Sequence, residues 1–434
     1  MPPTASRFHH AVAAALLLPA AALAGPPMDH GAHAPQDHQD HQDHQDPATA
    51  TPGLLGAYAM AREASGTSWQ PEAAGMTGRH LAAGDWKVML HGHADVVADT
   101  QGGDRGEDKV FVASMLMAMA QRSLGAATWG LRGMVSLDPV MGKRGYPLLF
   151  QTGETADGVT PLVDRQHPHD AFMELATTLS VPVGGGSVFA YVGLPGEPAL
   201  GPAAFMHRPS GLPLPEAPLS HHWLDSTHVT FGVVTLGATA GPFKLEGSVF
   251  NGREPDENRW NIETRKLDAY SGRLTWNPSR EWSVQASHGY LPSSELLEPE
   301  VALHRTTASA SHTHPTPGGG DWSTTFAVGI NREEGHDHPG WLLESARRFA
   351  GPWTAFGRVE AVENEHLVEE GPLAGETFTL GKLSLGGSRH LGTAGPLAFD
   401  VGALVSFYRV PGRLEDAYGE TPVSGMLFLR TRLE

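Results

Sequence analysis

The sequence predicts an all-β fold, an antiparallel transmembrane β-barrel of about sixteen strands (between 14 and 18), and three observations lead to it. Many segments alternate between apolar and polar side chains with period two, which is a strand signature because successive side chains in a strand point to opposite faces. The polar face holds charged, His and Met residues and is expected to line a lumen. Connections alternate between long ones and short ones rich in Gly, Pro and Asn, which suit tight hairpins.

The first residues have the features of a secretory signal peptide, which we predict over residues 1–24. Arg7 precedes a short apolar core at Ala11–Ala20, and Ala22-Leu23-Ala24 is a small-residue cleavage site. The apolar core is shorter than the roughly 20 residues that a membrane-spanning helix needs. We therefore expect an exported protein.

Residues 25–52 form a His- and Asp-rich tail that we predict to be disordered, because it has almost nothing apolar to bury. Asp-His-Gln occurs three times in register, and imidazoles beside carboxylates bind copper, zinc or nickel ions. The alternative is a solvated acidic linker. Residues 53–85 are predicted to be a linker or a partial plug in the barrel mouth. The predicted metal ligands of the tail are His30, His33, His38, His41, His44, Asp37, Asp40 and Asp43.

The barrel itself is predicted over residues 86–434. Its short connections are expected in the periplasm and its long ones outside the cell. The candidate strands are 86–99, 109–123, 127–138, 170–182, 186–194, 226–239, 242–251, 267–277, 281–291, 303–314, 321–332, 340–350, 352–364, 376–390, 396–409 and 423–433. The connections predicted to be long are 100–108, 139–169, 195–225, 252–266, 292–302, 333–339, 365–375 and 410–422.

Composition excludes several classes of function. The absence of Cys rules out disulfides and thiolate metal sites, so stability is expected from a closed hydrogen-bonded sheet. A formal net charge of −18 argues against nucleic acid as a partner. No Gly-x-Ser-x-Gly, His-Glu-x-x-His or phosphate-loop motif is present, so we expect no enzyme activity and no tightly bound cofactor.

One face of the first three candidate strands is rich in Met and His. Thioethers suit Cu(I), and imidazole suits copper in either oxidation state, so this face could pass a copper ion along the lumen. The alternative is that Met fills space against the plug. The residues of this predicted lumen face are Met89, His91, His93, Met115, Met117, Met119 and Met134.

The densest polar motif ends the longest predicted connection, at Asp164–Asp170. His167, His169 and Asp170 place two imidazoles and a carboxylate close together, which predicts a divalent-cation site at the outer mouth. The alternative is an ion-paired loop that folds inward as a constriction. Two looser candidates for metal binding are His221-His222 with His228, and His336-Asp337-His338.

Five stretches of the chain carry a family resemblance: Arg62–Pro71, Ser114–Gln121, Gly153–Gly158, Asp164–Asp170 and His221–His228. They resemble a family of uncharacterised exported bacterial outer-membrane barrel proteins associated with heavy-metal resistance. The layout, a His-rich tail before a barrel, is also similar to copper-resistance protein B, although the Asp-His-x-x-Met repeats of that family are absent here.

These observations together predict a barrel in the cell outer membrane, with its tail in the periplasm, that handles metal ions and copper in particular. The tail would bind ions, and the lumen would conduct or sequester them. One alternative is a general solute porin with an incidental His tail, and another is a closed barrel for binding or adhesion. Expected partners are membrane lipid, metal ions and periplasmic metal-handling proteins, with the barrel either a monomer or a homotrimer.

Overall fold

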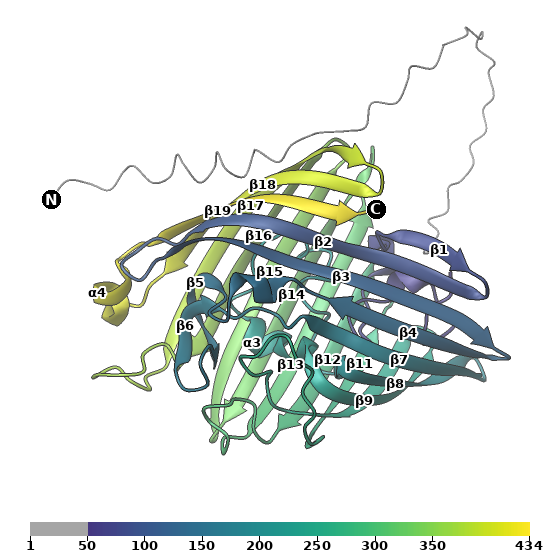
Figure 1. Ribbon diagram of the computed structural model, residues 1–434, viewed down its shortest axis with the longest axis horizontal. Coiled ribbons are helices and arrows are strands. Elements are labelled where there is room, and N and C mark those ends of the chain that lie inside the picture. The colour runs from purple at the N-terminus through teal and green to yellow at the C-terminus, as the bar shows by residue number, and fades with distance from the viewer. Residues whose placement is uncertain (1–50) are drawn as a thin grey trace, which may run out of the picture. The chain divides into compact units, whose positions relative to one another are not determined.

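The computed structural model describes residues 51–434, and within them sixteen strands form one closed antiparallel barrel (Figure 1). The prediction of a sixteen-stranded barrel is confirmed. The signal peptide and the predicted ligands of the tail lie outside the described residues. The barrel strands are β2 (Trp86–Thr100), β3 (Asp108–Leu124), β4 (Ala127–Val135), β7 (Phe172–Val183), β8 (Gly186–Gly196), β9 (Thr230–Ala240), β10 (Phe243–Phe250), β11 (Ala269–Trp276), β12 (Trp282–Leu291), β13 (Leu303–Pro315), β14 (Gly320–Glu333), β15 (His336–Phe349), β16 (Trp353–Asn364), β17 (Phe378–Ala394), β18 (Leu397–Arg409) and β19 (Val423–Leu433).

The barrel closes where the last strand, β19, pairs with the first, β2. Arg430 of β19 lies opposite Asp95 of β2, and its guanidinium donates to both carboxylate oxygens at 2.7 and 2.6 Å. A short strand, β1 (Arg79–Ala83), precedes the barrel and pairs with the start of β2. It lies within the stretch expected to be a linker.

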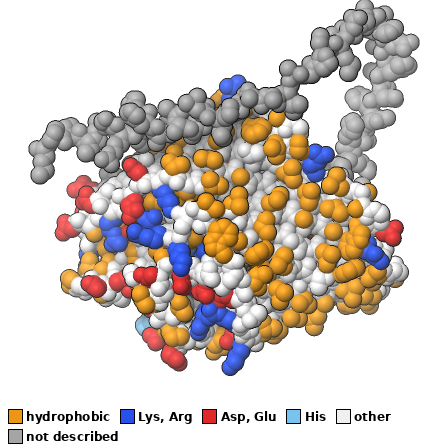
Figure 2. Space-filling view, in the orientation of Figure 1, with side chains coloured by type: hydrophobic (Ala, Val, Ile, Leu, Met, Phe, Trp, Pro, Cys, Tyr) orange, Lys and Arg blue, Asp and Glu red, His pale blue; other side chains and the backbone are white. Residues whose placement is uncertain are grey.

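Alternate side chains of each barrel strand face outward and inward. On β3, Val110 and Leu116 are 57% and 52% exposed, whereas their neighbours Phe111 and Met117 are 3% and 1% exposed. The same alternation in the other strands gives the barrel an apolar outer surface. Figure 2 shows apolar side chains spread over the strands of the visible face, with charged side chains gathered toward the end where Figure 1 places α4, β5 and β6.

Short connections join the strands at one end of the barrel, which we call the turn end. Gly125 and Gly184 have φ of +63° and +57° in two of these turns, a conformation that glycine adopts without the steric cost of a Cβ. Connections at the other end, the loop end, are long with one exception. Residues 333–339 were predicted to be a long connection, and this is wrong. Glu334 and Gly335 both have positive φ and form a two-residue turn, so His336 already belongs to β15.

The long connections contain a separate hairpin and several short helical turns. The hairpin is β5 (Tyr146–Thr155) with β6 (Pro161–Gln166), between β4 and β7. No helix in residues 51–434 is long and apolar enough to cross a membrane. The helical turns are η1 (Met60–Arg62), η2 (Glu72–Ala74), η3 (Asp138–Met141), α3 (His221–Leu224), η4 (Ser226–His228), η5 (Gly412–Leu414) and α4 (Glu415–Tyr418).

Residues 52–75, which we call the N-terminal plug, lie inside the barrel. Inward-facing side chains of five strands, and one of the β11–β12 turn, hydrogen-bond to this segment, and these contacts place it in the half of the lumen nearer the turn end. The bonds run from Gln121 to the carbonyl of Pro52 (3.0 Å), Ser187 to Leu55 (2.6 Å), Arg132 to Ala64 (3.1 Å), Asn277 to Gln70 (2.9 Å) and Ser283 to Trp69 (3.2 Å), and from Arg273 to the hydroxyl of Thr67 (3.0 Å).

The connection between β8 and β9, residues 197–229, also folds into the lumen. Arg208 donates to Glu344 of β15 at 2.7 Å and to Asp225 of the same connection at 2.5 Å. Glu216 accepts from Lys382 of β17 at 2.6 Å. All five of these residues are almost completely buried. The charged inner face of β15–β17 therefore pairs with the inserted connection rather than with water.

Candidate metal site in the barrel lumen

Two histidine-bearing segments that are far apart in the sequence meet inside the barrel. His167 and His169 end the β4–β7 connection, while His221, His222 and His228 lie on or beside α3 and η4 of the β8–β9 connection. The ring centroid of His228 is 5.1 Å from those of both His169 and His221. The ring centroid of His222 is 5.5 Å from that of His221 and 5.7 Å from that of His167. The five rings form one largely buried group, which we call the histidine cluster.

Each ring of the histidine cluster has its Nδ1 next to an oxygen. His169 Nδ1 is 2.8 Å from Asp138 Oδ2, and His221 Nδ1 is 2.8 Å from Asp225 Oδ1. His228 Nδ1 is 2.7 Å from the backbone carbonyl of Asp225. A carbonyl or carboxylate oxygen only accepts, so the imidazole proton of these rings belongs on Nδ1. The lone pair is then on Nε2, as in metal-binding histidines that are held by a carboxylate or carbonyl.

The Nε2 atoms of all five rings are buried and have no hydrogen-bond partner within residues 51–434. His167 and His222 are held more loosely than the other three, with Nδ1 at 3.4 Å from the Pro168 carbonyl and from Glu254 Oε1, respectively. A buried polar atom without a partner is costly and calls for an explanation. A metal ion bound to the Nε2 atoms would satisfy them.

The buried environment keeps most of the cluster uncharged. Burial lowers the pKa of His167, His221 and His228, and neighbouring imidazoles lower it further. His222 differs, because the charge of Glu254 outweighs the burial effect and raises its pKa. At neutral pH the first three rings are therefore neutral imidazoles, the form that binds metal ions.

The barrel wall holds α3 in place. Ser220, which precedes α3, donates to Glu360 of β16 from its hydroxyl at 3.1 Å. Trp223 of α3 packs against the wall where it has two glycines: a Cβ at Gly340 would lie 2.7 Å from Trp223 Cγ, and one at Gly329 would lie 2.1 Å from its carbonyl oxygen. Any larger residue at these two positions would displace the helix that bears His221 and His222.

Asp170, a predicted ligand, is part of an ion-pair network beside the histidine cluster. It pairs with Arg259 at 3.3 Å, and Arg259 also pairs with Glu154. Glu154 in turn lies 3.4 Å from His167 Nε2 without a hydrogen bond. The structure thus brings His167 and His169 to the cluster and places Asp170 in a neighbouring ion-pair network.

The predicted Met/His face lies on the inner side of β2, β3 and β4. His91 is opposite Met117 on the neighbouring strand, and its Nε2 is 3.1 Å from the Met117 sulfur. The other facing pairs are Met89 with Met119, His93 with Met115, and Met117 with Met134. Three further buried methionines, which the sequence analysis missed, pack into the same cluster: Met60 of the N-terminal plug, Met173 of β7 and Met206 of the β8–β9 connection.

His207 links this face, which we call the thioether wall, to the histidine cluster. Its ring centroid is 5.7 Å from that of His91. Burial and the charges of both His91 and His228 lower the pKa of His207, and its Nε2 has no hydrogen-bond partner among the described residues. The sequence signal that could have found it is the run Phe205-Met206-His207 inside a long connection.

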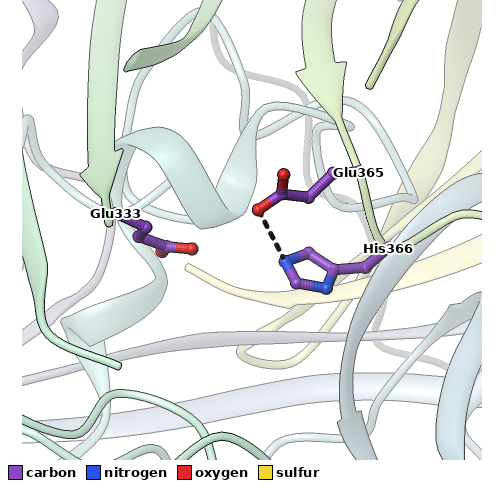
Figure 3. A group of neighbouring side chains, drawn as sticks. All are labelled: Glu333, Glu365 and His366. Carbon is purple, nitrogen blue, oxygen red and sulfur yellow. Dashed lines mark ion pairs between the residues drawn. The ribbon is translucent and has the colours of Figure 1, made fainter. Parts of the chain in front are cut away.

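A third group of candidate ligands lies at the loop end (Figure 3). Glu333, Glu365 and His366 offer ligand atoms that all lie within 4.8 Å of one another. Among the described residues this is the one group of three or more His, Asp or Glu that meets this distance. The nitrogens of the histidine cluster are therefore spaced more widely, and a single ion would draw its rings together.

Comparisons with known proteins establish the fold alone. No family model matches the sequence, and no curated protein is similar to it. Among solved structures, OmpF from Salmonella typhi, in complex with daunomycin, has a TM-score of 0.51 and 8% sequence identity, covering 82% of this chain and 100% of its own. OprB from Pseudomonas putida has a TM-score of 0.51 and 10% identity, covering 80% and 94%. The chain therefore has the fold of the outer-membrane porin barrels, while its resemblance to metal-resistance proteins stays a prediction.

Proposed function

We propose that this protein is an outer-membrane barrel that binds transition-metal ions, copper above all, in its lumen and passes them across the membrane. The apolar outer surface and the porin-type fold support the location. With the short connections in the periplasm, the loop end faces the outside of the cell. Outer-membrane lipid is then the surrounding medium, and the barrel works as a monomer or as a homotrimer.

The observation that carries the proposal is the set of five buried imidazoles with oriented Nδ1 and unpartnered Nε2 atoms. Imidazole suits copper, zinc and nickel, and hard ions such as Mg²⁺ and Ca²⁺ prefer oxygen ligands. The adjoining thioether wall adds soft ligands, which favour copper over the other two. His207 lies between the two ligand sets, so ions could move by exchange from one to the other.

The inserted segments favour selective transfer over free diffusion. The N-terminal plug and the β8–β9 connection occupy the lumen and bind its walls through buried hydrogen bonds and ion pairs. A solute without affinity for imidazole or thioether has no ligand to exchange with inside this space. The general solute porin is the second candidate, and the porin-type fold is the observation that favours it.

Transport into liposomes carrying the purified protein tests the proposal. We expect copper entry that saturates and little passage of a small neutral sugar. The triple variant His169→Ala, His221→Ala, His228→Ala should lose copper entry. A matched control replaces His288 and His304, which lie on the outer face of β12 and β13, and should transport normally. Equal, unsaturated passage of copper and sugar would establish a general porin, and no passage of either would indicate a closed binding barrel.

The tail has a separate role in this proposal, as a periplasmic metal-binding segment that hands ions to or from soluble metal-handling proteins. Substituting His38, His41 and His44 with Ala should lower the number of copper ions bound per chain at equilibrium. Unchanged copper binding would reject this role and leave the lumen proposal intact, because the two sets of ligands are separate in the sequence.

A further inference from the structure

The loop end of the barrel contains a cavity of about 510 Å³ with an acidic lining. It lies between the β12–β13 connection, the β14–β15 turn and the β16–β17 connection. Its charged or imidazole-bearing residues are Glu298, Glu300, Glu333, Glu334, His336, Glu365, His366 and Glu369. A cavity lined by one sign of charge concentrates ions of the opposite sign, so cations collect here.

Three side chains converge on one side of this cavity. Glu333 ends β14, and Glu365 and His366 directly follow β16, so the barrel itself brings them together (Figure 3). Their ligand atoms lie within 4.8 Å of one another, with His366 Nε2 at 3.8 Å from Glu365 Oε1. Small side-chain rotations would bring all three onto a single ion.

A fourth side chain gives independent support for a ligand at this place. His338 of β15 is only 7% exposed, and neither of its ring nitrogens has a hydrogen-bond partner within residues 51–434. Its Nε2 points to Glu365, 3.6 Å from Oε1. The two-residue β14–β15 turn sets this position, because it makes His336 the direct partner of Glu333 and leaves His338 on the inner face two residues further along.

The outer group is connected to the histidine cluster. A smaller cavity of about 60 Å³ is lined by His366, Glu295 and Glu298 at one side and by Glu154 at the other. Glu154 lies 3.4 Å from His167 Nε2. Glu295 interacts electrostatically with His366 and with His222. Acidic side chains therefore continue from the outer group to the first imidazoles of the cluster.

We propose that Glu333, His338, Glu365 and His366 form a second metal site, which collects divalent transition-metal ions from outside the cell before they reach the histidine cluster. The inference rests on the proposed function for the direction of transfer, but the site itself does not. Two carboxylates neutralise a divalent ion, and the mixture of nitrogen and oxygen ligands suits Zn²⁺, Cu²⁺ and Ni²⁺. This ligand set is less suitable for Cu(I), which prefers sulfur, and for Ca²⁺, which takes six to eight oxygens.

Binding of Zn²⁺ to the purified full-length protein tests the site, because Zn²⁺ has no redox chemistry to complicate the measurement. The conservative variant Glu333→Gln, Glu365→Gln should bind one Zn²⁺ fewer per chain than the wild type in equilibrium dialysis. Glu334→Gln is the matched control, since it removes a negative charge from the same cavity without touching the ligand set. It should keep the wild-type stoichiometry.

Transport kinetics separate the outer site from the histidine cluster. In liposomes with the loop end outward, the outer-site variant should raise the half-saturating Zn²⁺ concentration about tenfold and leave the maximal rate unchanged. Variants of His221 and His228 should lower the maximal rate instead. If the wild type transports no metal but the outer-site variant still loses one bound Zn²⁺, the site is supported and the transport function is rejected. Unchanged stoichiometry in the outer-site variant, or an equal loss in Glu334→Gln, would overturn the site.

Discussion

Two walls of the same lumen bury their inner faces by different chemistry. On β15–β17 the inward residues Glu344, Arg358 and Lys382 are charged. The inserted β8–β9 connection supplies a partner for each of them: Arg208 for Glu344, and Glu216 for Arg358 and Lys382. On β2–β4 the Met and His side chains of the thioether wall face inward, and they pack against one another without ion pairs. A side chain that is already held in a buried ion pair is not available to bind a metal ion. The comparison indicates that one wall anchors the inserted connection and the other keeps its ligand atoms available.

The largest expected effect comes from breaking the anchoring wall. Arg208→Met leaves Asp225 without its guanidinium and weakens the pairing of Glu344, both of them buried. Removing one partner of a buried ion pair typically costs about 3–5 kcal/mol, because the remaining charge stays in a low-dielectric site. We expect a loss of this size in the free energy of unfolding, measured by denaturant titration in detergent.

The control for this variant is Arg332→Met, which breaks a solvent-exposed pair with Asp337 at 3.4 Å. Exposed ion pairs contribute about 1 kcal/mol or less, so its stability should hardly change. Equal stability of Arg208→Met and the wild type would contradict the view that the β8–β9 connection is anchored by buried charge.

The next effect concerns the orientation of one histidine. Asp138 accepts from the Ser114 amide through Oδ1 (2.7 Å) and from His169 through Oδ2. Asp138→Asn keeps the first bond but presents an NH₂ group to His169 Nδ1, which moves the imidazole proton to Nε2 and removes the lone pair there. Loss of such a supporting group typically lowers metal affinity about 10–100-fold.

We expect this loss of copper affinity with little change in the denaturation midpoint. Asp104→Asn, in the exposed β2–β3 connection, is the control and should bind copper as the wild type does. Undiminished affinity in Asp138→Asn would show that His169 is not a ligand.

Acid should affect the histidine cluster and the Arg208–Asp225 ion pair at different pH. His167, His221 and His228 have lowered pKa values in the folded protein, and an unfolded histidine titrates near 6.5. Between the lowered values and about 6.5 the unfolded chain binds more protons, so stability falls as the pH drops through 6.5, by at most about 1.4 kcal/mol per pH unit for each ring. Denaturation midpoints measured from pH 7.5 to 5 check this, and a flat profile would contradict it.

Two further titratable groups, His222 and Asp225, also contribute to the dependence of stability on pH. His222 has a raised pKa, so it contributes the opposite slope, stabilising at low pH, and Glu254→Gln should remove that contribution and steepen the acid loss. The charge of Arg208 outweighs burial and lowers the pKa of Asp225, so the stability that this carboxylate contributes should persist well below pH 4. If the histidine cluster and the Arg208–Asp225 pair lost their stabilising effect at the same pH, this view of their separate chemistry would be wrong.

The smallest effect on stability is expected on the thioether wall. Met117→Leu nearly conserves volume and should cost less than about 1.5 kcal/mol. It removes the sulfur 3.1 Å from His91 and should slow copper transport while leaving Zn²⁺ transport unchanged. Met426→Leu, a buried methionine of β19 outside this wall, is the matched control and should change neither rate. Equal copper transport rates in both variants would indicate that the methionines of this wall only fill space.

The strands could be predicted from the sequence because alternation is a local property. In Trp86–Thr100 and the neighbouring strands, a few consecutive residues are enough to indicate both the extended conformation and which side chains face inward. The partners of that inner face could not be predicted in this way. Glu344 of β15, for example, pairs with Arg208, which lies 136 residues earlier in a connection whose inward path leaves no periodic signal. The same limit explains why a two-residue turn at Glu334 was missed among polar residues.

The candidate site was predictable in parts. His167 and His169 were predicted from their spacing, and His221 and His228 were noted as a separate group. The two groups come together only because the β4–β7 connection, before β7, and the β8–β9 connection, after β8, both fold into the lumen. Asp170 was chosen because it adjoins these histidines in sequence, whereas the fold turns it toward Arg259. The supporting groups Asp138 and Asp225 carried no signal of their own.

The bond network of Arg430 has a consequence for how the barrel assembles. Its guanidinium joins Asp95 across the seam between the last strand and the first, and it also donates to the carbonyl of Leu212 in the inserted connection, at 2.6 Å. The same guanidinium therefore couples the closing seam of the barrel to the inserted connection. A barrel without the β8–β9 connection in its lumen would close with one of these hydrogen bonds missing.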